Sequence, residues 1–235
     1  MNTNVADAYI LGNDYIFGYG ATVSTARLSY HHGNLRTALL ERAGRLLEEV
    51  GAEKLSLREL ARQAGVSHGA PRQHFPDKQS LLDALAAAGF DRMGAVLDAA
   101  LDAADGGLFR HRLEVFAQAW VGFATAHPAL LELMFASKNR PGAHRLRAAA
   151  DQAFGRSSAM IAEAALRGEI GGGSDETERD RTAMAIFATV QGLAALVTSG
   201  MSGDRPVDAL VSGTVRTLLD GLRPRIFSRG TEPGH

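Results

Sequence analysis

Cysteine is absent from this chain of 235 residues, and charge of neither sign dominates it. The first absence excludes a disulfide framework, a thiolate zinc site and a cysteine nucleophile. The second follows from 26 acidic and 25 basic residues, a balance unlike the high net charge of disordered proteins. Apolar residues make up 46% of the sequence. This composition favours one or two globular domains.

Secretory and membrane segments also have little support. Residues 1–26 hold no Lys or Arg, so the basic start of a signal peptide is missing and we expect a cytoplasmic protein. Residues 182–203 carry no charge, but they include Gln191, Gly192 and several Thr and Ser. A spanning helix needs about 20 predominantly apolar residues. We therefore predict a buried helix here and no membrane partner.

Apolar residues at steps of three and four predict an all-α fold of about nine helices, because no strand-like alternation appears. Residues 1–29 are interrupted by glycine and lack a period, so we interpret them as a flexible arm or as the result of a start codon placed too far upstream. An arm that binds the minor groove is the alternative, although only Arg27 is available for it. We expect a three-helix domain over 30–80, a larger helical domain over 81–225 and a tail over 226–235. Residues 27–78 hold nine basic and six acidic side chains, which favours a polyanionic partner for the first domain.

Residues 56–75 predict a helix-turn-helix. Ser56 and Glu59 form a capping box at the start of the first helix, and Gly65 supplies the positive φ of the turn. Ser67 then opens a second short helix from His68 to Phe75. The outer face of this helix is polar and short enough to enter a major groove. A plain helical hairpin is the alternative.

The same stretch carries a family resemblance. The run from Leu57 to Lys78 resembles the DNA-binding domain of TetR-type transcriptional regulators, with His74, Phe75 and Lys78 ahead of a Leu-rich helix. The lead-in from Tyr30 and the segment 124–135 are similar to a branch with a WHG-like effector domain. The resemblance covers about residues 30–200 and implies a DNA-binding repressor that dimerises through its last two helices.

Two groups of DNA contacts are expected, since phosphate contacts position a protein and base contacts specify its site. Arg72 stands where the family often has Tyr, and its donors suit a phosphate. Gln73 suits adenine in the major groove. The phosphate candidates are Arg36, Arg72, His74 and Lys78. The base-reading candidates are Ser67, His68, Gly69 and Gln73.

Two recognition helices must lie about 34–36 Å apart to read an inverted repeat in double-stranded DNA, which requires a homodimer. Small residues at steps of four, three and four would let a second helix approach closely. They are Ala188, Gly192, Ala195 and Ser199. The alternative is that this face packs inside its own subunit.

Aromatic and sulfur-containing side chains in the second domain are candidates for a small-molecule effector pocket. They are Phe116, Trp120, Phe123, Met134 and Phe187, with Phe135 and Met184 beside them and with His127 and Gln191 as polar groups. The alternative is that they are simply core. The branch often has Trp and His where Phe187 and Gln191 stand.

No enzyme, metal site or cofactor is expected. The histidines lack zinc spacing, and Gly171–Gly173 lacks the lysine of a phosphate-binding loop. We therefore expect a ligand-responsive, homodimeric DNA-binding regulator, a repressor released from an inverted repeat by a small, largely apolar effector. The alternative function is an all-α small-molecule binding or interaction protein whose DNA reading has been altered or lost.

Overall fold

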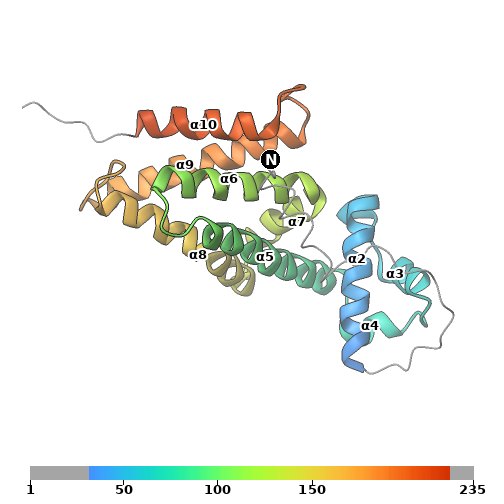
Figure 1. Ribbon diagram of the computed structural model, residues 1–235. Coiled ribbons are helices and arrows are strands. Elements are labelled where there is room, and N and C mark those ends of the chain that lie inside the picture. The colour runs from blue at the N-terminus through green and yellow to red at the C-terminus, as the bar shows by residue number, and fades with distance from the viewer. Residues whose placement is uncertain (1–31, 223–235) are drawn as a thin grey trace, which may run out of the picture.

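The computed structural model describes residues 32–222. All regular secondary structure in that range is helical and forms nine helices (Figure 1). The expected arm, residues 1–29, and the expected tail, residues 226–235, lie outside the described residues. The helices are α2 (His32–Lys54), α3 (Leu57–Ala64), α4 (Ala70–His74), α5 (Lys78–Ala103), α6 (Phe109–Ala126), α7 (Pro128–Lys138), α8 (His144–Leu166), α9 (Glu176–Thr198) and α10 (Val207–Gly221). The predicted all-α class is confirmed.

Helices α2, α3 and α4 lie together at one end of the molecule, and we call them the head (Figure 1). The side chain of Ser56 accepts a hydrogen bond from the Glu59 amide at 3.2 Å, so the predicted cap forms. Gly65 ends α3 with φ 66°, a conformation that costs glycine little, and its N–H turns back to the α3 carbonyls. The apolar face of α3, with Leu60 and Ala61 fully buried, packs against α2.

The second helix of the motif is shorter than predicted. It begins at Ala70, not at His68, and Ser67 makes no side-chain cap. The Ala70 amide donates to the Ser67 carbonyl at 3.0 Å, so a turn replaces the first two expected helical residues. Pro71 therefore lies in the first turn of α4. Its missing N–H costs little there.

Helix α5 joins the head to the rest of the molecule. Its 26 residues span about 39 Å, and the Asp77 carboxylate caps its start by accepting from the Ser80 amide at 2.7 Å. Two glycines on this helix admit close neighbours. A Cβ at Gly94 would lie 3.1 Å from the Ala153 Cα of α8, and a Cβ at Gly89 would lie 2.6 Å from the Met134 Sδ of α7.

The remaining helices form a layered body around α5. Helices α6, α7 and α8 pack on α5, while α9 and α10 pack on the other side of α6 (Figure 1). Helices α6 and α7 meet at 102° because His127 leaves helical geometry and Pro128 starts the next helix. One continuous apolar core, from Leu39 in α2 to Val215 in α10, runs through the head and the body.

Candidate nucleic-acid interface and aromatic core

The outer face of α4 and its preceding turn is solvent-exposed. Its polar groups face away from Pro71 and Phe75, which are buried against the head. The exposed residues are Ser67, His68, Gly69, Arg72 and Gln73. No carboxylate of residues 32–222 lies within ion-pair distance of Arg72, so none of these residues neutralises its charge. This surface has the donors and the shape that a major groove accepts.

The four phosphate candidates have unequal environments. Arg36 is exposed, with its guanidinium 5.3 Å from the centre of the Phe75 ring. The Lys78 ammonium donates to the Glu53 carbonyl at 2.6 Å, so one of its three N–H groups holds the end of α2. The Nε2 atom of His74 is buried and has no hydrogen-bond partner within residues 32–222. Arg36 and Arg72 therefore present their charge most openly.

A second arginine of the head, Arg62 on α3, has its charge compensated by an ion pair. Arg62 donates to both oxygens of Glu59, and Gln63 adds a third bond at 2.7 Å. These bonds, Arg62 first, lower the pKa of the Glu59 carboxyl to about 2. The charge of Arg62 is thus compensated locally, in contrast with Arg72.

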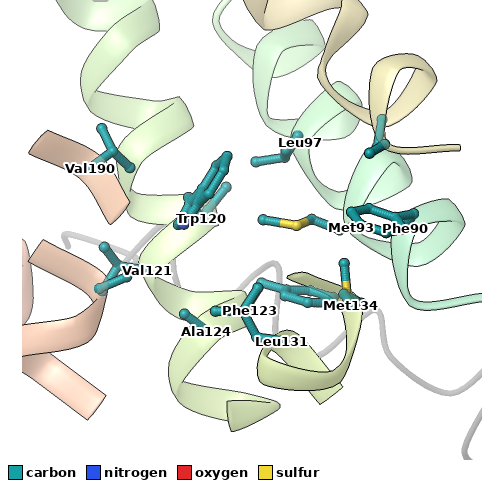
Figure 2. Close-up of a cluster of buried hydrophobic side chains, with 14 of the residues drawn as sticks. Phe90, Met93, Leu97, Trp120, Val121, Phe123, Ala124, Leu131, Met134 and Val190 are labelled. Carbon is teal, nitrogen blue, oxygen red and sulfur yellow. The ribbon is translucent and has the colours of Figure 1, made fainter. Parts of the chain in front are cut away.

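The centre of the body is an aromatic cluster around Trp120. Its ring stacks on Phe154 at 5.0 Å between centroids and lies 5.7–6.5 Å from Phe116, Phe135 and Phe187. Rings at these distances touch, so an aromatic ligand enters only if a ring moves. Figure 2 shows Trp120 of α6 facing Met93 and Leu97 of α5.

Two polar groups enter this apolar region. The Trp120 indole N–H donates to the Gln191 side-chain oxygen at 3.2 Å, which joins α6 to α9. Burial, and then the charge of Arg92, lowers the pKa of His127 to about 4, so this imidazole is neutral at pH 7. Its ring lies edge-on to Phe123 at 5.3 Å.

The structure brings some predicted effector residues together and separates others. Phe116, Trp120, Phe187 and Gln191 share one cluster, Phe123 pairs with His127, and Met134 lies against Gly89. Met184, expected beside them, is 69% exposed on the opposite face of α9.

Sequence reasoning missed two rings of the cluster, Phe90 and Phe154, which lie 6.4 Å apart and edge-on. The available signal was weak. Phe154 is the only aromatic residue between His144 and Leu166.

The four small residues proposed for the dimer contact are exposed, three of them on α9 and Ser199 at its C-cap. They do not pack inside this subunit, and a Cβ at Gly192 would meet nothing within 4 Å. A shallow groove adjoins them, lined by Thr189 and by α10 residues that include Ala209, Gly213 and Thr217. Exposed small residues of α9 and a shallow groove between α9 and α10 thus lie on the surface of a single chain.

Helix α9 differs from the buried helix that was predicted. By length and composition it is the one unbroken helix in residues 32–222 that could cross a membrane, and 28% of its most apolar window is buried. A core helix of a globular protein passes the same test, so this is weak support for a membrane span. The burial is one-sided because Ile186 and Val190 face α6 while Ala188 and Gly192 face outward.

Metal ligands do not cluster in the described residues, where no three His, Cys, Asp or Glu side chains lie close enough together to hold an ion.

Two family descriptions match the chain. Residues 39–85 match "Bacterial regulatory proteins, tetR family", and residues 113–218 match "Tetracyclin repressor-like, C-terminal domain". The first covers most of the head and the start of α5, and the second covers most of α6 to α10. No curated protein matches.

Solved structures with the same fold include a protein of unknown function from Rhodococcus sp. RHA1. It is 43% identical, with a TM-score of 0.75 over 84% of this chain and 100% of that one. The TetR family regulator PfmR from Thermus thermophilus is 18% identical, with a TM-score of 0.59 over 79% and 99%. The fatty acid degradation regulator FadR from Bacillus halodurans is 18% identical, with a TM-score of 0.58 over 83% and 100%. The last two likenesses show the fold alone.

Proposed function

Because the chain belongs to the TetR family of bacterial regulatory proteins, we propose that it is a ligand-responsive transcriptional repressor that binds an inverted repeat as a homodimer. A small, largely apolar effector releases it from DNA. The protein acts by binding and not by catalysis, in the cytoplasm, where its DNA partner lies. The observation that carries the proposal is the exposed polar face of α4, backed by the buried Pro71 and Phe75.

DNA binding rests on the charge and geometry of this face. Arg72 is exposed and uncompensated, so it binds a phosphate, or a guanine where it turns inward. Gln73, exposed beside it, reads adenine. Lys78 also holds the end of α2, and the Nε2 atom of His74 is buried, so their part in DNA binding is smaller than that of Arg36 and Arg72.

Dimerisation rests on the open face of α9 and α10. Ala188, Gly192, Ala195 and Ser199 on α9 lie beside the groove that α10 lines, so a second copy seats its own pair of helices there. This assembly buries the apolar surface of Met184 and Leu196, which are 69% and 45% exposed in a single chain. Isologous contacts of this kind generate a two-fold dimer, as an inverted repeat requires.

Effector binding rests on the cluster around Trp120. Its rings come from α5, α6, α7, α8 and α9, so a ligand that displaces one ring moves a helix. Gln191 and His127 supply the polar contacts. Ligand binding then shifts the population between two placements of the head.

The decisive experiment selects duplexes from a random DNA pool with the purified protein and sequences the survivors. We expect an inverted repeat with half-site centres about one helical turn, 34–36 Å, apart. Affinity should also fall steeply between 50 and 200 mM salt, by about 10³-fold or more if six or more phosphates are contacted. Survivors without a shared pattern would favour the alternative, a small-molecule binding protein whose DNA reading has been lost.

Two variants distinguish a phosphate contact, which positions the protein on DNA, from a base contact, which gives sequence specificity. Arg72→Ala should weaken binding to all duplexes, whereas Arg145→Ala removes the same charge from exposed α8 and should leave affinity unchanged. Gln73→Ala should relax the preference for one base pair, worth about 1–3 kcal/mol. An unchanged base preference would remove Gln73 from the reading residues.

A further inference from the structure

Glu48 of the head forms the longest-range hydrogen bonds to the body in the described chain. Its two carboxylate oxygens accept from the Ala129 amide at 3.1 Å and from the Leu130 amide at 3.0 Å. These amides belong to the first turn of α7, where a helix leaves its N–H groups without internal partners. His127 makes no side-chain cap of its own. The head therefore supplies the cap, and its negative charge suits the helix end.

Helix α7 connects this cap directly to the aromatic cluster. The ring of Phe135, less than two turns further on, lies 6.4 Å from Phe90 and 6.5 Å from Trp120. Met134 is pressed so closely on α5 that a Cβ at Gly89 would clash with it. Displacement of either side chain therefore pushes on the C-terminal half of α7, while Glu48 holds the first turn of the same helix.

The place where α2, α5 and α7 meet contains a buried charge and a small crevice. Arg92 of α5 is 8% exposed, and the Glu48 carboxylate opposes the fall in its pKa that burial causes. Arg92 lines a mostly apolar crevice of about 60 Å³ where α2, α5 and α7 meet, together with Leu40, Gly44, Ala88 and Leu130. Small residues leave this space between α2 and α5.

We propose that Glu48 is a positioning residue that transmits movement of α7 to the head, with the first turn of α7 as the pivot. The role of this movement in releasing DNA rests on the proposed function. The movement itself is independent of DNA. While Glu48 caps α7, a change in the cluster tilts α2 and with it α3 and α4. Without the cap, α7 moves and the head stays.

The test uses the absence of cysteine. Arg58→Cys on α3 and Ala162→Cys on α8, both exposed, carry spin labels, and double electron–electron resonance gives the head-to-body distance. Labelled chains are mixed with excess unlabelled protein so that only intrachain pairs contribute. Met134→Ala serves as the probe of core displacement in place of an effector. The backgrounds are Glu48, Glu48→Ala, Glu48→Gln and the matched control Glu49→Ala, which removes the same charge one residue away.

Three results are expected. Met134→Ala shifts the distance distribution when Glu48 is present and in the Glu49→Ala control. It produces no shift in Glu48→Ala and a reduced one in Glu48→Gln, which keeps an acceptor but no charge. Hydrogen-exchange protection of the Ala129 and Leu130 amides falls about tenfold in Glu48→Ala and is unchanged in Glu49→Ala.

A shift of equal size with and without Glu48, or no shift in either background, overturns the proposal. Unchanged protection of the two amides in Glu48→Ala overturns it as well. None of these readouts contains DNA, so they can fail while duplex selection succeeds, and the reverse.

Discussion

The head and the aromatic core of the body place their functional side chains in opposite environments. On α4 the polar groups Arg72 and Gln73 are exposed, and only Pro71 and Phe75 behind them are buried. Around Trp120 the rings are enclosed, with Phe116 at 0% and Trp120 at 3% exposure. The function of the head thus depends on the side chains that it exposes, and that of the core depends on how its rings pack together. Substitutions on the exposed face of the head should therefore change binding without changing stability, whereas substitutions in the core should change both.

The largest effect is expected where the core is emptied. Phe116→Ala should lower the free energy of unfolding by about 3–5 kcal/mol, because a fully buried ring leaves a cavity. Gln73→Ala, on the exposed face of α4, should change it by less than about 0.5 kcal/mol. Urea unfolding followed by circular dichroism measures both. Similar losses in the two variants would break the contrast between the regions.

Acid should act on the body through His127. The unfolded imidazole binds a proton below pH 6.5, whereas the folded one, with its pKa at about 4, does so only in stronger acid. Stability is therefore full above pH 6.5 and falls as the pH drops to 4, by about 1–2 kcal/mol for this partly exposed group. His127→Phe should flatten this part of the pH profile. An unchanged slope in His127→Phe would assign the acid sensitivity to other groups.

The same substitution, glycine to alanine, at two positions tests how closely α5 packs against α8. Gly94→Ala should destabilise by about 1 kcal/mol, because the new methyl group would lie 3.1 Å from the Ala153 Cα. Gly155→Ala on α8 meets nothing within 4 Å and should stabilise by about 0.5–1 kcal/mol through helix propensity. Thermal unfolding of both variants gives the sign. Stabilisation by both would mean that α5 and α8 have room to part.

The smallest effect is expected at the exposed ion pair of the head. Arg62→Gln should lower the urea midpoint at pH 7 by a small but measurable amount, because exposed pairs contribute little and the Glu59 carboxylate loses its charged partner. It should raise the pKa of Glu59 from about 2 toward 4.5, which an NMR titration of the carboxyl resolves. An unmoved titration would mean that Gln63 alone holds the carboxylate.

The head could be predicted further than the body because its signals are local. Ser56, Gly65 and the spacing between them act through their own backbone, and the structure has the cap and the turn where they were expected. The start of α4 was wrong by two residues, because a turn at Ser67 satisfies the Ala70 amide without a helix. In the body, apolar periodicity indicates which residues are buried but not which rings meet, so Phe90 and Phe154 were missed and Met184 was misplaced.

Local sequence patterns were enough to predict the helical class, the turn at Gly65 and the polar face that follows it, because these features depend on neighbours within a few residues. The packing of the helices, in contrast, places Glu48 at the start of a helix more than 80 positions away, joins Trp120 to Gln191 and leaves the small residues of α9 uncovered. Such contacts depend on how helices cross. Crossing is set by the summed packing of the whole core and not by any local pattern.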